Sequence, residues 1–297
     1  MNPFLKWPGS KRSVADKIFR HVPKQGNVYC EPFAGSCALA LHTQYEHYFI
    51  NDINADLITM LRFAATEPEE FIYQSRPYFS AQNHDAERYY ALRDEYNASD
   101  CARTRALLLH YLSRFGYNGL VRYNRSGEFN VPVGRYRRLP YFPESEIHQF
   151  ADKLQSATFT AMPFESFLAQ RFESATIVCD PPYIPLNATA SFTAYAPVPM
   201  ADRTPHDRLN ALCLTQAQQG NNVYVCNHRI DCVDQYYPDA QYYVNYFAKR
   251  HIAANAKKRK QIKETLLYYP SSLGGRITNR MKTQTGSPDS AAQAKVA

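Results

Sequence analysis

The chain has 297 residues, of which 45% are hydrophobic and 21% are charged. This composition supports a packed core and excludes wholesale disorder. The formal net charge of +7 suits a polyanionic partner without requiring one. The length predicts one large domain or a domain that carries a sizeable insertion.

The seven cysteines are scattered along the chain and include no Cys-x-x-Cys pair. Structural zinc needs closely spaced ligand pairs, so the spacing argues against a zinc site, and the odd count argues against a disulfide framework. The first residues contain no apolar signal segment, and no stretch approaches the length of a membrane span. We therefore expect a cytoplasmic protein in a reducing environment, monomeric in solution and without a metal.

Seven short apolar or aromatic runs, each bounded by turn residues, are predicted to be buried strands. They cover residues 28–33, 47–52, 157–162, 176–179, 222–226, 241–247 and 264–269. Helices are predicted between several of them, at residues 11–21, 55–65, 164–171 and 204–219. This alternation predicts an α/β fold with a doubly wound, mostly parallel seven-stranded sheet and helices on both faces. The last two strands have no apolar helix between them, so we expect an antiparallel pair at the end of the sheet.

Residues 57–142 interrupt this alternation and are predicted to form an inserted domain. Helices are predicted at residues 87–97 and 103–114, and the turn sequence Gly116-Tyr117-Asn118-Gly119 follows them. We interpret this region as a helical subdomain with a protruding hairpin, inserted into a sheet domain made of residues 1–56 and 143–270. The tail, residues 271–297, contains no aromatic residue and is predicted to be disordered.

Two strand ends carry carboxylates that suit a nucleoside. The first strand ends in Glu31-Pro32-Phe33-Ala34-Gly35, which is predicted to make a tight turn into a helix. Ligands bind outside such strand ends in doubly wound sheets, and glycine lets a ligand approach the backbone. Asp52 closes the second strand, where a ribose diol is usually bound, although it could instead cap the helix that starts near residue 55. The missing Gly-x-Gly-x-x-Gly sequence favours a cofactor without phosphates over a nicotinamide.

The strand at residues 176–179 runs directly into Asp180-Pro181-Pro182-Tyr183. The two prolines fix φ and remove two backbone donors, so the carbonyls of Asp180 and Pro181 are held rigidly. An exocyclic amino group offers two N–H donors, which a carboxylate and a carbonyl together satisfy. This pairing favours sp3 character at the nitrogen, whose lone pair can then attack an electrophilic methyl group while Tyr183 stacks on the ring. The alternative is an ordinary proline-rich turn after a buried strand.

The sequence Asp-Pro-Pro-Tyr resembles the fingerprint of amino-directed DNA methyltransferases. Further blocks in the same order resemble the Dam-type DNA adenine-N6 methyltransferases over about residues 3–270. The resemblance implies that the inserted domain, residues 57–142, is a DNA target-recognition domain. It precedes the Asp-Pro-Pro-Tyr strand, as in the alpha-class arrangement of these enzymes. The matching blocks are residues 4–11, 31–35, 51–54, 114–124, 127–132, 180–183, 192–195 and 226–228.

The resemblance implies a site-specific DNA adenine methyltransferase of bacterial or phage origin that takes its methyl group from S-adenosylmethionine and leaves S-adenosylhomocysteine. Its substrate would be double-stranded DNA, at the sequence GATC, and the buried adenine amine requires that the base be flipped out. The catalytic residues that it implies are Asp180, Pro181, Pro182 and Tyr183. The cofactor-binding residues that it implies are Trp7, Lys11, Glu31, Phe33, Gly35, Asp52, Phe164 and Asp180. The DNA-binding residues that it implies are Lys6, Tyr117, Asn118, Leu120, Arg122, Asn124, Pro132 and Tyr136.

The charge pattern adds to the expected DNA contacts. Residues 103–138 carry eight arginines and one acidic residue. Arginine's planar fork fits phosphates and the major-groove edge of guanine, so Arg122 is predicted to read a base. A second basic segment, residues 249–260, is predicted to lie against the DNA backbone; a solvated surface is the alternative for both segments. The arginines predicted to hold phosphates are Arg114, Arg135, Arg137 and Arg138.

The sequence also allows other functions. Methylation of cytosine N4 or of RNA uses related amine chemistry, and a catalytically inactive DNA-binding module would have the same fold. Phe192 and Tyr195, beyond the tetrad, are expected either to close over the flipped base or to brace the loop.

Overall fold

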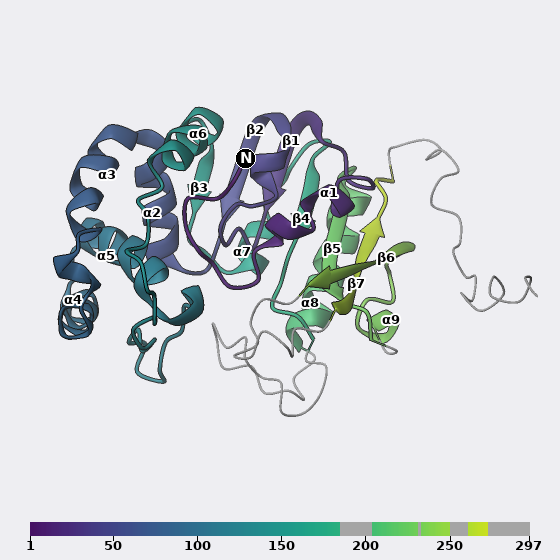
Figure 1. Cartoon of the computed structure of the whole chain (residues 1–297). Helices are drawn as coiled ribbons and strands as arrows, with labels where there is room; N and C mark the ends of the chain where they lie inside the picture. The colour runs from purple at the N-terminus through teal and green to yellow at the C-terminus, as the bar shows by residue number, and fades with distance from the viewer. Residues whose placement is uncertain (185–203, 231–232, 250–260, 273–297) are drawn as a thin grey trace, which may run out of the picture.

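The structure, a computed structural model, describes residues 1–184, 204–230, 233–249 and 261–272 (Figure 1). Its strands are β1 (Gln25–Glu31), β2 (Gln44–Asn51), β3 (Thr158–Thr160), β4 (Thr176–Cys179), β5 (Asn222–His228), β6 (Tyr242–Lys249) and β7 (Gln261–Tyr269). Its α-helices are α1 (Ala15–Ile18), α2 (Ala55–Thr66), α3 (Pro68–Ser75), α4 (Ala86–Ala98), α5 (Ala102–Phe115), α6 (Glu144–Leu154), α7 (Phe164–Leu168), α8 (Thr204–Gln218) and α9 (Val233–Tyr236). Its 3₁₀ helices are η1 (Lys11–Ser13), η2 (Ala40–His42), η3 (Arg76–Tyr78), η4 (Gln82–His84) and η5 (Tyr117–Gly119).

A seven-stranded sheet organises the chain, with the strand order β3-β2-β1-β4-β5-β7-β6. The first five strands of this order pair in parallel, whereas β7 pairs antiparallel with both β5 and β6. The predicted mostly parallel sheet with an antiparallel pair at its end is confirmed. The chain order reverses between β1 and β4, and ligands of doubly wound sheets bind outside the carboxyl ends of the strands at this reversal.

Both faces of the sheet are buried. Val223 and Val225 of β5 belong to one apolar core, together with residues of α7 and α8. Tyr224 and Cys226, the alternate residues of the same strand, belong to a second core on the opposite face. Because both faces are covered here, β4 and the middle of β5 are buried and apolar at successive positions, which makes them recognisable in the sequence.

Helices α2 to α6 gather beside the β3 end of the sheet, on the left of Figure 1. Helix α5 packs against α2, α3 and α4. Helix α6, which was not predicted, packs against α2 and α3 although its residues fall in the range assigned to the sheet domain. Its buried residues are Ile147, Phe150, Ala151 and Leu154.

Two predicted helices differ from the structure. In the range 11–21 the chain forms η1 and then α1, separated by Val14, whose φ of −122° and ψ of 0° lie outside the helical region. The helix predicted directly after Gly35 does not form. Gly35 has a φ of 48° and Cys37 a φ of 54°, a left-handed backbone that a right-handed helix cannot contain, so the chain turns before η2 begins.

The predicted hairpin after α5 is present. Antiparallel bridges join Gly116 to Val133 and Tyr123 to Phe129. Phe192, Tyr195, residues 250–260 of the second basic segment and the tail from residue 273 lie outside the described residues. Among the helices that the structure describes, none is long and apolar enough to cross a membrane.

Candidate active site

Three carboxylates lie at the carboxyl ends of neighbouring parallel strands. Glu31 is the last residue of β1, Asp52 follows β2 and Asp180 follows β4. Since β1 pairs with both β2 and β4, the sheet brings these strand ends to one edge. This edge includes the reversal point of the sheet, where a ligand crevice is expected.

Lys11 reaches the tetrad from the N-terminal segment. Its Nζ lies 3.0 Å from Oδ1 of Asp180 and 4.5 Å from the centroid of the Tyr183 ring, and it donates a hydrogen bond to the carbonyl of Gly9 across 3.1 Å. Burial lowers the pKa of Lys11, but the carboxylates of Asp180 and Glu264 outweigh that effect and raise the pKa overall. Burial raises the pKa of Asp180, and the ion pair with Lys11 opposes that rise. Lys11 therefore stays charged and favours the ionised form of Asp180.

The segment after the tetrad is braced by β5. Oδ1 of Asn227 accepts a hydrogen bond from the backbone N–H of Ile184 across 3.1 Å. Nδ1 of His228 lies 2.9 Å from the carbonyl oxygen of the same residue. The His228 ring also meets the Tyr183 ring in a T-shaped contact, with 4.7 Å between centroids. Residues 226–228 belong to the family resemblance, and the structure shows that Asn227 and His228 hold the tetrad loop against the sheet.

Glu31 has one oxygen satisfied and the other unsatisfied. Oε1 accepts hydrogen bonds from the hydroxyl of Tyr29 and the backbone N–H of Ala40, each across 2.9 Å. Oε2 is buried and has no hydrogen-bond partner among the described residues. Burial raises the pKa of Glu31 to about 8, although the two hydrogen bonds oppose it. A buried acceptor without a partner at a strand end fits a ligand that brings a donor.

Asp52 ties the turn after β1 to the end of β2. Its Oδ2 accepts from the backbone N–H of Gly35 and its Oδ1 from that of Asn54, each across 3.0 Å. The residue that caps α2 is Asn54, whose side chain accepts from the N–H of Leu57 across 2.9 Å. The alternative in which Asp52 is merely the helix cap is therefore wrong. Burial raises the pKa of Asp52, against the effect of its backbone donors.

Aromatic rings border the same edge of the sheet. A Cβ atom on Gly35 would lie 3.0 Å from Cδ1 of Trp7, so a residue without a side chain lets the indole approach the turn. The half-buried rings of Phe33 and Phe164 pair at 5.2 Å between centroids. The residues expected to bind the cofactor thus come from several segments to the ends of β1, β2 and β4.

Asn51 is a further residue of this site, and its role was not predicted from the sequence. It is fully buried, and its Nδ2 donates to the carbonyls of Pro32 and Met162, each across 3.0 Å. Its Oδ1 accepts from Oγ1 of Thr160 across 2.9 Å. Asn51 therefore joins the ends of β1, β2 and β3. An amide directly before the strand-end carboxylate was the available signal.

The hairpin after α5 carries most of the residues expected to contact DNA. Its two arms are joined by hydrogen bonds from the N–H of Tyr117 to the carbonyl of Pro132 (2.8 Å) and from the N–H of Asn130 to the carbonyl of Arg122 (3.0 Å). Among the residues expected to contact DNA, the half-buried ones are Tyr117, Leu120 and Tyr136. The exposed members are Lys6, Asn118, Arg122, Asn124, Pro132, Arg135, Arg137 and Arg138.

Lys6 joins the hairpin from the N-terminal segment. Its Nζ lies 4.6 Å from the centroid of the Tyr136 ring. A Cβ atom on Gly119, whose φ is 64°, would lie 2.9 Å from Cβ of Lys6. The two segments expected to read DNA, far apart in sequence, are therefore in contact.

Arg122 is already oriented in the structure. Its Nε donates to Oδ1 of Asn130 across 2.7 Å, and its Nη2 donates to the carbonyl of Asn130 across 3.1 Å. One edge of the guanidinium is held against the hairpin, although the side chain as a whole is exposed. This fixed fork fits the bidentate geometry that base reading requires.

Arg114 does not fit the expected phosphate contact. It is 5% exposed, and its Nε and Nη2 both donate to the carbonyl of Phe4. The guanidinium would have to leave this buried carbonyl to reach a phosphate, so in this structure Arg114 joins α5 to the N-terminal segment. Helical position alone could not distinguish the buried arginine from the exposed ones.

Comparisons with known proteins agree on the family. The family model of D12 class N6 adenine-specific DNA methyltransferases matches residues 7–260. The protein called DNA adenine methylase in Salmonella typhi is 40% identical over 277 residues, covering 90% of this chain and 94% of that protein. Those of Escherichia coli (39% over 267 residues, covering 90% and 94%) and Vibrio cholerae (38% over 274 residues, covering 91% and 96%) are similar to the same extent.

Among solved structures, SMU.472, a putative methyltransferase complexed with SAH, aligns with 91% of this chain and 54% of its own at 11% identity. The TM-score of 0.37 is too low for this likeness to carry any argument. The family match and the curated relatives decide the assignment without it. The chain is an enzyme that belongs to the D12 class of N6 adenine-specific DNA methyltransferases.

Proposed function

We propose that this enzyme transfers a methyl group from S-adenosylmethionine to N6 of an adenine flipped out of duplex DNA, at the sequence GATC. The observation that carries the proposal is the position of Asp180-Pro181-Pro182-Tyr183 at the reversal point of the sheet, beside two further strand-end carboxylates. The proposed amine-binding tetrad would therefore lie next to the proposed nucleoside-binding edge.

The residues at the sheet edge fit S-adenosylmethionine. Asp52 would hold the ribose hydroxyls, and Phe33 and Phe164 would line the adenine with their paired rings. The unsatisfied Oε2 of Glu31 offers an acceptor to a donor group such as an ammonium. Trp7, Lys11, Gly35 and Asp180 complete the proposed set. When bound, the cofactor's sulfonium supplies an electrophilic methyl group.

The tetrad would prepare the amine for attack. The carboxylate of Asp180 and the carbonyl of Pro181 accept the two N–H groups of the amine, which makes its lone pair available. The ionised carboxylate of Asp180 is the stronger acceptor, and the ion pair of 3.0 Å with Lys11 favours that state. Tyr183 would stack on the flipped base and keep its amine in the plane of these acceptors.

The hairpin would select the DNA sequence. Arg122, held by Asn130, presents a fixed guanidinium to a guanine in the major groove. Lys6, Tyr117, Asn118, Leu120, Asn124, Pro132 and Tyr136 form the rest of the proposed reading surface, which we assign to an inserted domain at about residues 57–142. Arg135, Arg137 and Arg138 are exposed and suit phosphates, which position the enzyme without specifying sequence.

Transfer of a labelled methyl group from S-adenosylmethionine to unmethylated mixed-sequence DNA tests the proposal. We expect label on adenine N6, within GATC, and a loss of about a hundredfold or more in rate for Asp180→Ala with DNA binding retained. Label on cytosine N4 or a preference for RNA would replace the substrate assignment, and another adenine consensus would replace GATC. An absence of transfer to any nucleic acid would favour an inactive DNA-binding module.

A further inference from the structure

A buried carboxylate outside the tetrad holds the tetrad's tyrosine. The hydroxyl of Tyr183 donates a hydrogen bond to Oε2 of Glu264 across 3.2 Å. Glu264 lies on β7, 81 residues further along the chain, and is 7% exposed. A second hydroxyl, that of Tyr246 on β6, donates to the same oxygen across 3.1 Å. Two O–H donors therefore converge on one carboxylate oxygen beside the proposed active site.

The register of the antiparallel strands puts Glu264 in this place. Glu264 is paired with His228 on β5 and with Tyr246 on β6. Directly opposite side chains of an antiparallel pair lie on the same face of a sheet, so these three form a row across three strands. The His228 ring contacts the Tyr183 ring at 4.7 Å between centroids, and Glu264 holds its hydroxyl. The Tyr183 ring is thus fixed by two members of one row.

The protonation states suit these hydrogen bonds. Burial raises the pKa of Tyr183, and the charge of Asp180 adds to the rise. Burial also raises the pKa of Tyr246, with contributions from Cys226 and Glu264. Both hydroxyls remain protonated donors at neutral pH, which leaves Glu264 as the acceptor. Hydrogen bonds from hydroxyls to a carboxylate are shorter and about twice as strong as those between neutral groups.

We propose that Glu264 is a positioning residue for methyl transfer: through the hydroxyl of Tyr183 it fixes the plane of the ring on which the target base stacks. This inference rests on the proposed function, which gives Tyr183 the stacking role. A ring free to rotate would move the amine away from the acceptors at Asp180 and Pro181. A displacement on the order of 1 Å at such a site costs about a hundredfold in rate.

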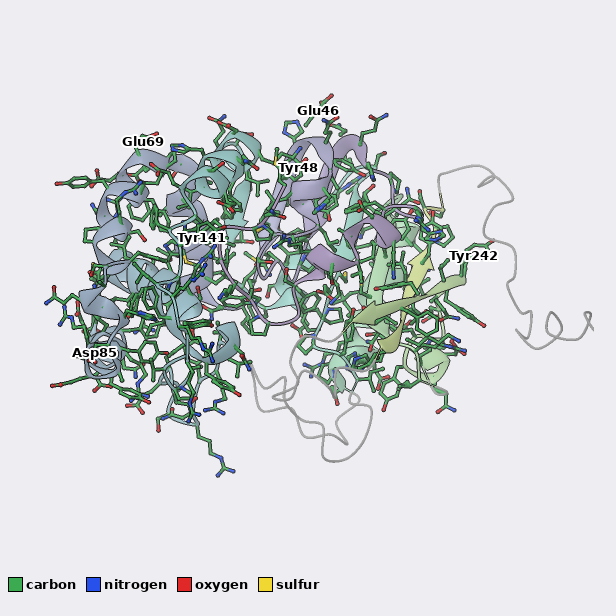
Figure 2. All side chains as sticks on the ribbon, viewed as in Figure 1. Glu46, Tyr48, Glu69, Asp85, Tyr141 and Tyr242 are labelled. Carbon is green, nitrogen blue, oxygen red and sulfur yellow. The ribbon has the colours of Figure 1, made fainter. Side chains whose placement is uncertain are left out.

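The substitution Glu264→Gln keeps the side-chain size and replaces the carboxylate by a neutral amide, whose single oxygen is a weaker acceptor for the Tyr183 hydroxyl. We expect the single-turnover rate constant of methyl transfer to fall about 10- to 100-fold, while the Kd values for S-adenosylmethionine and for DNA change less than about twofold. DNA with 2-aminopurine at the target position should give an altered fluorescence in the complex, since the flipped base stacks differently. The matched control is Glu46→Gln, on the exposed part of β2 (Figure 2), for which wild-type values are expected.

A double-variant cycle separates positioning from general destabilisation. Tyr183→Phe keeps the stacking ring and removes the hydroxyl, so it should reproduce the loss of rate. The double variant Glu264→Gln/Tyr183→Phe should be no slower than Tyr183→Phe alone, because both changes act on the same interaction. Losses that multiply, or a wild-type rate in Glu264→Gln, would overturn the inference.

The other possible outcomes of these experiments also test the role of Glu264. If urea denaturation shows that Glu264→Gln does not fold, Tyr183→Phe alone tests the contact, and a wild-type rate in that variant overturns the inference. If the wild-type enzyme transfers no methyl group to adenine, the proposed function fails and takes this inference with it. An active wild-type enzyme with a fully active Glu264→Gln variant overturns the role of Glu264 alone.

Discussion

Two strand-end carboxylates of the site are buried but differ in their partners. Glu31 is hydrogen-bonded by neutral donors only, and burial raises its pKa to about 8. Asp180 has the ammonium of Lys11 at 3.0 Å, which opposes the effect of burial on its pKa. The environments therefore favour a protonated Glu31 before a cationic ligand binds, whereas Lys11 favours the ionised form of Asp180 although burial leaves the pKa of that carboxyl raised.

Removing Lys11 should expose the effect of burial on Asp180. In Lys11→Met the pKa of Asp180 rises further, so a smaller fraction of the carboxylate is ionised at neutral pH. We expect the acid limb of the profile of kcat against pH to move to higher pH, by about one unit or more. The profile measured from pH 5.5 to 9 checks this shift. An acid limb that stays in place, with only a uniform loss of rate, would contradict the role of the ion pair.

Glu31 should make stability depend on pH. Its folded-state pKa of about 8 lies above that of an unfolded glutamate, so its contribution is fully present below the unfolded pKa and is lost as pH rises to about 8. The free energy of unfolding should fall across this window by up to about 1.4 kcal/mol per pH unit from this group. Glu31→Gln removes this ionisation. The free energy of unfolding of the variant, relative to that of the wild type, should therefore rise from pH 5 to pH 8. Urea denaturation at several pH values measures it, and parallel curves would refute it.

At the scale of elements, strands were easier to predict than helices. All seven strands were predicted as apolar or aromatic runs between turns, and in β4 and β5, at the centre of the sheet, such runs arise because both faces are buried. Helix α6 carries apolar residues at helical spacing, namely Ile147, Phe150 and Leu154, but acidic and polar residues separate them. The predicted helices are interrupted after Gly35 and at Val14 by local backbone angles, which a periodic sequence pattern does not reveal.

The site residues also divide into those that a local sequence pattern reveals and those that depend on the folded structure. Motifs placed the carboxylates of β1, β2 and β4 correctly at one edge of the sheet, since parallel strands bring their carboxyl ends together. Glu264 was missed because its position beside Tyr183 depends on the register of an antiparallel strand that follows the tetrad by many residues. The burial of Arg114 could not be predicted, because it depends on a contact with the N-terminal segment.

The contacts of Arg122 in the hairpin predict how its substitution changes the discrimination between bases. Arg122→Ala should relax discrimination at one base of the target, by about 1–3 kcal/mol, because it removes a bidentate contact. Asn130→Ala should have a weaker effect of the same kind, since Asn130 only orients the guanidinium. Methylation rates on DNA substrates with single base changes measure the discrimination. Arg125→Ala, at the exposed tip, is the control, and equal loss on all substrates for Arg122→Ala would contradict base reading.

At the scale of the whole molecule, the sheet and the hairpin that follows α5 are linked by short contacts. Asn54, the cap of α2, donates to the hydroxyl of Tyr123 on the hairpin across 3.1 Å. Asp56 in the first turn of the same helix forms an ion pair of 2.6 Å with Arg105 of α5. The residue that holds the turn after β1, Asp52, is two positions before this cap. One helix start therefore connects the proposed cofactor edge to the proposed reading surface.

The net charge of +7 and the exposed arginines of the hairpin region predict how DNA affinity responds to salt. Each phosphate contact releases counterions, so the logarithm of the affinity should fall linearly with the logarithm of the salt concentration, with a slope of about 0.9 per contact. Arg135→Ala should reduce that slope by about one for every DNA sequence, because Arg135 is expected to hold a phosphate.

Arg20→Ala is the matched control for this measurement. Arg20 is exposed and precedes β1, so it lies toward the amino ends of the strands, away from the edge that carries the site. Fluorescence anisotropy of labelled DNA at several salt concentrations gives both slopes. We expect the wild-type slope for Arg20→Ala and a smaller slope for Arg135→Ala on GATC and on unrelated DNA alike. Equal slopes for the two variants would mean that DNA does not lie against the arginines that follow the hairpin.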